Sequence, residues 1–157
     1  MSHILRFLQV FAIGTWVGAI VYFAAVVTRG AFAVLPNADL AGALVGVTIK
    51  GLHGLGIIAA VIYLVASLGL GRSVRALAEP AALGVILMLV LTLASQRIVL
   101  PRMDALRARM GSVDATPREN LLRVEFDRLH RVSVQIESGV LLVGLAALFL
   151  TVRGGVR

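Results

Sequence analysis

The stretch Arg123-Val124-Glu125-Phe126-Asp127-Arg128-Leu129-His130-Arg131-Val132-Ser133-Val134-Gln135-Ile136-Glu137 leads directly into an apolar segment that ends near Val152. Residues three, four and seven apart share one face of an α-helix. On that basis one face carries a polar stripe made of Arg123, Asp127, His130, Ser133 or Val134, and Glu137. The apolar segment is long enough to cross a bilayer core of about 30 Å. The stretch therefore predicts a membrane helix whose polar face continues into the bilayer.

The composition of the chain also indicates a membrane protein. Hydrophobic residues make up 59% of the 157 residues and charged residues 15%, whereas soluble domains contain about 45–50% apolar residues. The length predicts one domain over residues 1–157. The net charge is +7, and the basic residues lie beside hydrophobic spans without interleaved aromatic residues. The expected partners are therefore the lipid bilayer and its anionic headgroups, and not nucleic acid. The absence of cysteine excludes disulfides, thiolate ligands and a cysteine nucleophile.

Four apolar runs predict an all-α integral membrane four-helix bundle. The expected spans are residues 4–28, 51–71, 80–100 and 131–152, with a projecting helix 3–helix 4 hairpin over residues 101–130. The first run is too long for a signal peptide and is expected to be retained. Both termini are then expected on one side, which carries five Lys and Arg residues against ten on the hairpin side. This count favours a cytoplasmic hairpin, although acids pair with many of the ten.

Other local signals concern the location of the protein and the ends of the helices. One lysine against fourteen arginines fits a GC-rich bacterial genome, and the predicted location is the bacterial cytoplasmic (inner) membrane. Glu79-Pro80 favours a helix start, and Gly111 predicts a helix stop. Thr116-Pro117-Arg118-Glu119 has the pattern of a capping box, so the fourth helix is expected to begin there.

Four polar side chains are expected to lie close together near the hairpin side of the membrane, namely His53, Arg97, His130 and Glu137. Glu137 is the most informative, because an ionisable residue inside a span is costly and is by default a functional hypothesis. We expect Arg97 to pair with Glu137 and the two histidines to form the floor of a pocket. The alternative is an ion pair that only joins helices.

The same residues allow three further interpretations. His53, His130 and Glu137 form a candidate ligand set for Zn, Fe or Mn, and facing histidines can bind haem b, so the cofactor is unknown with a metal ion or haem as options. The glycine pairs Gly14/Gly18 and Gly42/Gly46 allow close helix packing and predict a homo-oligomer. No catalytic residue stands out, because the chain has no HExxH spacing, phosphate loop or Ser-His-Asp set. An enzyme is therefore expected less than a binding protein.

Four segments resemble the transmembrane protein 205-like family, a small four-span membrane domain of unknown function. The matching pieces are Gly14-Thr15-Trp16-Val17-Gly18, then His53, then Leu91-Thr92-Leu93-Ala94 with Arg97 and Pro101-Arg102, and finally Phe126-x-Arg128-x-His130-x2-Ser133. The family has asparagine where this chain has Glu137. The resemblance implies four helices and no established reaction.

Two classes of function follow from these observations. In the first, the polar cluster makes the protein a binding or permeation module for an ion, metal, haem or small solute. In the second, the protein is a non-catalytic structural or accessory subunit that self-associates through its glycine-rich helix faces.

Overall fold

The computed structural model describes residues 2–155 and confirms the all-α four-helix bundle, with no strand in that range. Its four long helices are Ser2–Val34, Ala38–Gly71, Pro80–Met110 and Leu121–Gly154, each long and apolar enough to cross a membrane. The first consists of α1 (Ser2–Tyr22), the π-helical turn η1 (Phe23–Val27) and α2 (Thr28–Val34). The others are α3 (Ala38–Gly71); α4 (Pro80–Ala94), the π-helical turn η3 (Ser95–Val99) and α5 (Leu100–Met110); and α6 (Leu121–Gly155). A short 3-10 helix, η2 (Val74–Ala78), joins α3 to α4.

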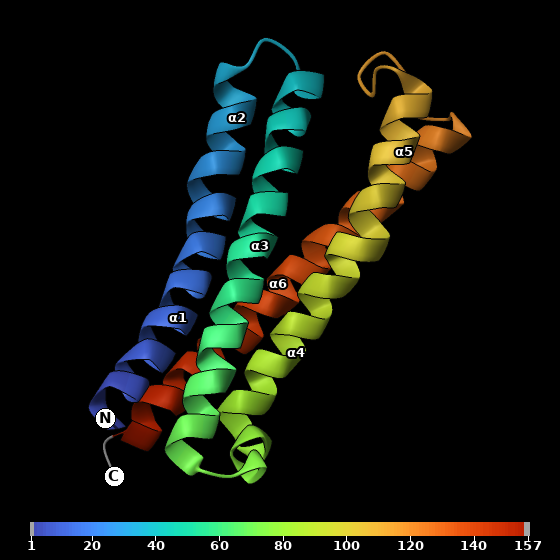
Figure 1. Ribbon diagram of the computed structural model, residues 1–157. Coiled ribbons are helices and arrows are strands. Elements are labelled where there is room, and N and C mark those ends of the chain that lie inside the picture. The colour runs from blue at the N-terminus through green and yellow to red at the C-terminus, as the bar shows by residue number, and fades with distance from the viewer. Residues whose placement is uncertain (1, 156–157) are drawn as a thin grey trace.

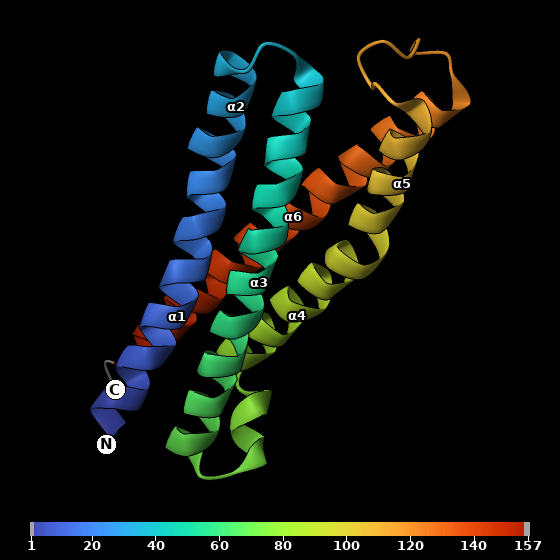
Figure 2. The same ribbon diagram turned by 45° about the horizontal axis from the view of Figure 1, so that its top comes forward.

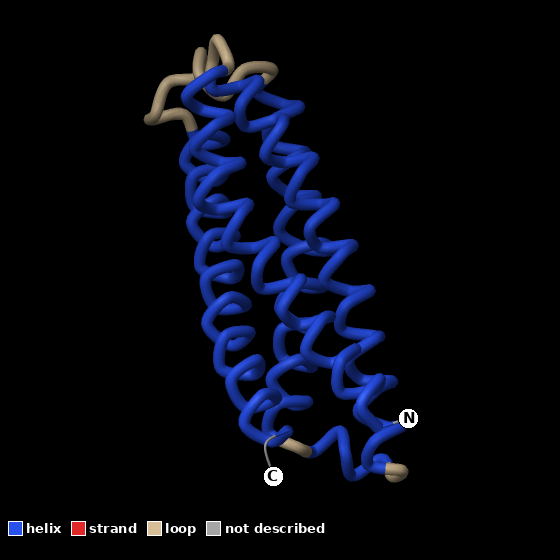
Figure 3. Tube along the Cα trace, turned by 90° about the vertical axis from the view of Figure 1, so that its left-hand side faces the viewer, coloured by secondary structure: helices blue, strands red, loops and turns tan. Residues whose placement is uncertain are grey.

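The helices run up and down, and the described ends of the chain lie at the same end of the bundle (Figure 1). At that end α6 (red) lies beside α1, but α6 crosses the bundle and lies far from α2 at the opposite end (Figures 1 and 2). A side view shows loops gathered only at the two ends of the bundle (Figure 3). The helices are therefore tightly packed toward the termini and splayed toward the hairpin.

The core is built around Trp16, which is 1% exposed and lies against Gly56 of α3. A Cβ atom added at Gly56 would lie 2.4 Å from the indole ring, so only glycine leaves room for it. Met88 and Val140 are fully buried beside it and continue the core into α4 and α6. Trp16 is therefore a packing residue.

Charged side chains bracket an apolar segment on each of the four helices. The brackets are Arg6 and Arg29, Lys50 and Arg72, Glu79 and Arg97, and Arg131 and Arg153. At 1.5 Å per residue these segments are about 33–35 Å long on the first, second and fourth long helices. The segment on the third long helix is about 27 Å long, and all four lengths are close to the thickness of a bilayer core. Inside the brackets Glu137 is the single Asp, Glu, Lys or Arg.

Two helical hairpins extend past this apolar belt on the side away from the termini. The apolar arm, residues 30–49, consists of most of α2 and the first turns of α3, and the charged arm, residues 101–130, contains α5 and the start of α6. Only the charged arm was predicted to project. The apolar arm lies outside the predicted spans 4–28 and 51–71 because its helices continue well beyond the charges at Arg29 and Lys50.

The helix ends in the charged arm differ partly from the sequence signals. α5 ends at Met110, and Gly111 follows with φ +73°, a left-handed conformation that glycine adopts without strain. The predicted capping box is wrong, because α6 begins at Leu121 and Asn120 accepts a hydrogen bond from the Leu122 amide. The Thr116 hydroxyl instead donates to the carbonyl of Ser112. This bond stabilises the loop before α6 and does not cap the helix.

Candidate functional site

A buried histidine joins three helices near the hairpin side of the apolar belt. His53 of α3 is 1% exposed, and its Nδ1 lies 2.8 Å from Oε1 of Gln96. Its Nε2 lies 2.6 Å from Oε1 of Glu137, whose side chain is 14% exposed. Both ring nitrogens are therefore engaged by groups from the third and fourth long helices.

These distances are compatible with three arrangements of protons. In one, a neutral His53 donates from Nδ1 to Gln96 and accepts at Nε2 from a protonated Glu137. If both ring nitrogens carry a proton, the imidazolium donates to Gln96 and to an ionised Glu137, and the pair has no net charge. If His53 is neutral with its proton on Nε2, the Gln96 amide turns so that its NH₂ group donates to Nδ1. Exchange between these last two forms requires a proton and an amide rotation but no backbone movement.

The π-helical turn η3 places Gln96 at this position. Pro101 has no N–H with which to continue the α-helical pattern, and the Leu100 amide bonds to the Ser95 carbonyl, which is five residues back. Figure 2 shows the change of direction between α4 and α5 at this point. π-helical turns of this kind often occur at functional sites. Gln96, which lacks a charge, was missed as a partner of His53; its position on the same face as Thr92 and Ser95 was the available signal.

Arg97 lies on the outside of the bundle, and the expected ion pair with Glu137 is not formed among residues 2–155. Adjacent helical residues point about 100° apart, so a helix that directs Gln96 inward directs Arg97 outward. An exposed arginine at this level can extend its guanidinium to the headgroups. His53 replaces it as the partner of Glu137.

Glu137 lines a cavity of about 490 Å³, which we call the hairpin-side groove. The groove extends between the two arms and is lined by apolar side chains of the first helix and α3, among them Ile20, Phe23, Phe32 and Ile49. Its α6 wall contains the whole predicted stripe: Arg123, Asp127, His130, Ser133, Val134 and Glu137. The groove therefore has apolar walls on one side and a polar wall that leads to Glu137.

His130 and His53 have different environments. His130 is exposed and lines the groove about 10 Å from Glu137 along α6, whereas His53 lies behind Glu137. Within residues 2–155 no three His, Cys, Asp or Glu side chains are close enough to hold a metal ion. The set His53, His130 and Glu137 is thus not assembled as a three-ligand centre in this conformation.

Polar contacts join the two arms across the groove. Lys50 Nζ lies 2.6 Å from Oδ2 of Asp104, and the Ala38 amide donates to Asp114. Asp39 accepts hydrogen bonds from the Ser112 hydroxyl and the Val113 amide. The Ser112 bond holds the pKa of Asp39 below its ordinary value of 3.8; burial opposes this effect, and the Val113 and Asp114 amides and the Arg107 charge add to it. The loop is thereby fixed to the N-terminus of α3.

The four predicted glycines fall into two classes. A Cβ atom at Gly14 or Gly18 would meet nothing within 4 Å, so this pair packs against no other helix of the described chain. A Cβ atom at Gly42 or Gly46 would lie 3.1 or 3.5 Å from the guanidinium of Arg107. The second pair therefore accommodates a side chain instead of a neighbouring backbone.

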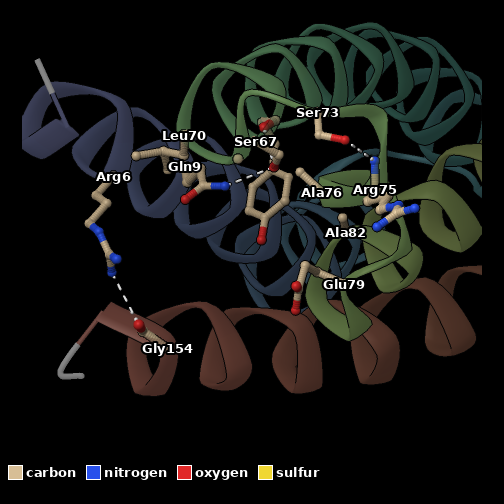
Figure 4. Close-up of a pocket in the computed structure, with 12 residues that line it drawn as sticks. Arg6, Gln9, Ser67, Leu70, Ser73, Arg75, Ala76, Glu79, Ala82 and Gly154 are labelled. Carbon is tan, nitrogen blue, oxygen red and sulfur yellow. Dashed lines mark hydrogen bonds between the residues drawn. The ribbon is translucent and has the colours of Figure 1, made fainter.

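A second cavity, of about 630 Å³, lies at the terminal end of the bundle. Figure 4 shows Gln9 pointing at Ser67, with Arg6 reaching Gly154 on one side and Arg75 beside Ser73 on the other. Gln9 donates to the Ser67 hydroxyl at 2.7 Å, and the Tyr63 hydroxyl lies 2.7 Å from that of Thr151. Gln9, Tyr63, Ser67 and Thr151 were missed from the sequence because none of them carries a charge and they come from three different spans.

The comparisons with known proteins identify a family but no function. No curated protein and no solved structure matches the chain. Residues 11–112 match the family model of a domain of unknown function, DUF4149, and nothing ties the chain to the transmembrane protein 205-like family. The match includes His53 and Gln96 and stops before α6, so Glu137 lies outside it. Because the matched segment covers more than half of the chain, the protein belongs to the DUF4149 family of domains of unknown function.

Proposed function

We propose that this protein is a membrane binding module that takes a small organic cation into the hairpin-side groove, in the cytoplasmic membrane of a bacterium. The cation would bind at Glu137 in exchange for one proton of the His53–Glu137 pair. The observation that carries the proposal is the position of Glu137, which touches the groove on one side and a buried histidine on the other. An ionisable pair at membrane depth costs free energy and is retained most readily for binding or transport.

The charges and walls of the groove favour an organic cation. Five carboxylates line it, from Asp39, Asp104, Asp114, Asp127 and Glu137, against three cationic side chains, from Lys50, Arg107 and Arg123. The apolar walls formed by the first helix and α3 would contact a hydrocarbon substituent, as in most small-molecule sites. This combination suits an alkylammonium group better than a bare, strongly hydrated metal ion.

The exchange keeps the charge of the site constant. Before binding, the imidazolium of His53 balances the Glu137 carboxylate. When the ammonium group pairs with Glu137, one proton leaves Nδ1 of His53, and the Gln96 amide turns to donate to that nitrogen. The neutral imidazole still donates from Nε2 to Glu137, so one cation enters and one proton leaves.

Proton release would test this exchange. Purified protein in weakly buffered maltoside detergent, mixed with butylammonium chloride and a pH indicator, should release up to about one proton per chain at saturation. Sodium chloride at equal ionic strength should release much less. Glu137→Gln should abolish the release, whereas Glu125→Gln, an exposed acid on the charged arm, should preserve it. Equal release from Glu137→Gln, or none from the wild type, would refute the proposal.

Self-association is a second candidate function, favoured by the open surface at Gly14 and Gly18. Such small residues let a helix of another copy approach closely. Light scattering in mild detergent should give the mass of an oligomer for the wild type. The double variant Gly14→Ile/Gly18→Ile should be monomeric and still folded, because a Cβ atom at either position would meet nothing within 4 Å. A monomeric wild type would reject this candidate.

A further inference from the structure

Arg107 is a cation of the hairpin-side groove that forms no ion pair with residues 2–155. The other two lysine or arginine side chains of the groove are engaged, since Lys50 pairs with Asp104 and Arg123 with Asp127. Its Nε is buried and lacks a hydrogen-bond partner in the same range. A buried N–H without an acceptor costs free energy, so the guanidinium is a donor group that the chain leaves unsatisfied.

Contacts with Phe126, Gly42 and Gly46 hold the guanidinium of Arg107 in place. Its carbon lies 5.5 Å from the centre of the Phe126 ring, a cation–π distance. Its two Nη atoms lie over Gly42 and Gly46, where a Cβ atom would approach to 3.1 and 3.5 Å. A planar guanidinium held in this way is preorganised for bidentate contact with a phosphate group.

The level of Arg107 in the membrane matches that of lipid phosphates. Gly46 and Gly42, over which the guanidinium lies, are about 6 and 12 Å beyond Lys50 along α3, on the hairpin side of the apolar belt. The polar headgroup layer extends about 5–7 Å past the bilayer core on each side. In a helix the side chain leans toward the N-terminus, which for α5 is the direction of the membrane.

The groove below Arg107 can accept an acyl chain. Its walls include Phe23 and Phe32 of the first helix, and Phe32 is 54% exposed. On the α6 side Val134 lines the groove and is 52% exposed. α2 and the first turns of α6 lie apart in both views (Figures 1 and 2). In a membrane the exposed apolar side chains Phe32 and Val134 are accessible to lipid.

We propose that Arg107 binds the phosphodiester of a membrane phospholipid whose acyl chain lies against the first helix in the hairpin-side groove. Asp39, which feels the charge of Arg107, binds the Ser112–Val113 loop, and Asp104 binds Lys50, so neither acid pairs with the guanidinium. This site is about 10–16 Å from the His53–Glu137 pair along α3 and does not depend on the function proposed for that pair.

Native mass spectrometry with dioctanoyl-phosphatidylglycerol tests the proposal on the full chain in maltoside detergent. We expect one lipid per chain at low micromolar concentration. Arg107→Gln should weaken binding by about tenfold or more, and Arg107→Lys should be intermediate because lysine keeps the charge but not the fork. Arg102→Gln, an exposed arginine on the same helix, should bind like the wild type. Unchanged binding by Arg107→Gln would overturn the proposal.

Two comparisons on the wild type need no variant and hold even if Arg107→Gln folds poorly. Dioctanoylglycerol, which has the same chains without the phosphate, should bind at least about tenfold more weakly than dioctanoyl-phosphatidylglycerol. Millimolar inorganic phosphate should not displace the lipid. Equal binding of dioctanoylglycerol would show an apolar groove without a phosphate site. Displacement by inorganic phosphate would show a site for a free anion, and either result overturns the proposal.

Discussion

The contact between Trp16 and Gly56 leaves no room for a side chain at position 56. Gly56→Ala would place a methyl group 2.4 Å from a ring that is 1% exposed and has no room to move. Overpacking of this kind costs about 1–3 kcal/mol, which exceeds the helix-propensity gain of about 1 kcal/mol from replacing glycine. We therefore expect Gly56→Ala to lower the midpoint of thermal unfolding in detergent.

Gly54→Ala is the matched control, two residues earlier on the same helix. A Cβ atom at Gly54 would meet nothing within 4 Å, so only the helix-propensity gain remains. This variant should be as stable as the wild type or slightly more stable. If both variants changed the midpoint equally, the close approach of Trp16 to Gly56 would not determine the packing of α1 on α3.

The helix α3 begins with a set of acceptors that also hold the opposite arm. Asn37 accepts from the Leu40 amide, Asp114 accepts from the Ala38 amide, and Asp39 binds Ser112 and Val113. Negative groups are favoured at this end by the helix dipole. Because the folded-state pKa of Asp39 is lowered, its contribution is present above pH 3.8 and is lost as the pH falls through the lower, folded value.

We expect Asp39→Asn to release the loop around Val113 while the bundle stays folded. The neutral amide keeps one acceptor oxygen but loses the charge, so the Val113 amide should exchange with deuterium about tenfold faster, equivalent to about 1.4 kcal/mol. Hydrogen exchange followed by mass spectrometry at neutral pH measures this. Glu125→Gln on the same arm should leave the exchange unchanged. Faster exchange spread over α5 and α6 would instead indicate loss of the whole arm.

The elements also show what the sequence can and cannot predict here. Apolar runs bounded by charges predict the four helices, and the spacing of polar residues predicts the α6 wall of the groove. The partner of Glu137 was predicted wrongly: charge favoured Arg97, but the partner is His53, whose other ring nitrogen meets Gln96, the residue that the π-helical turn η3 directs inward. The shape of the groove depends on how α6 crosses the other helices, which no local pattern in the sequence contains.

At the scale of the whole molecule, the positions of the described ends predict a simple topology. Single cysteines at Ser2, Val74 and Gly154 should be labelled from one side of the membrane, and a cysteine at Ser112 from the other. The chain has no native cysteine, so each variant carries one label. In inverted and right-side-out bacterial vesicles we expect Ser112 to be cytoplasmic, following the ten Lys and Arg residues on that side. Labelling of Ser2 and Gly154 from opposite sides would contradict the fold.

The unequal apolar segments have a consequence for the surrounding lipid. The bracketed part of the third helix, between Glu79 and Arg97, is shorter than the other three by about 6–8 Å. Hydrophobic mismatch of this kind is met by local deformation of the bilayer, at fractions of a kcal/mol per Å. We expect the annular lipids to be thinner along α4 than around α1. Short-chain lipids and proteins with short transmembrane segments should therefore gather on that flank.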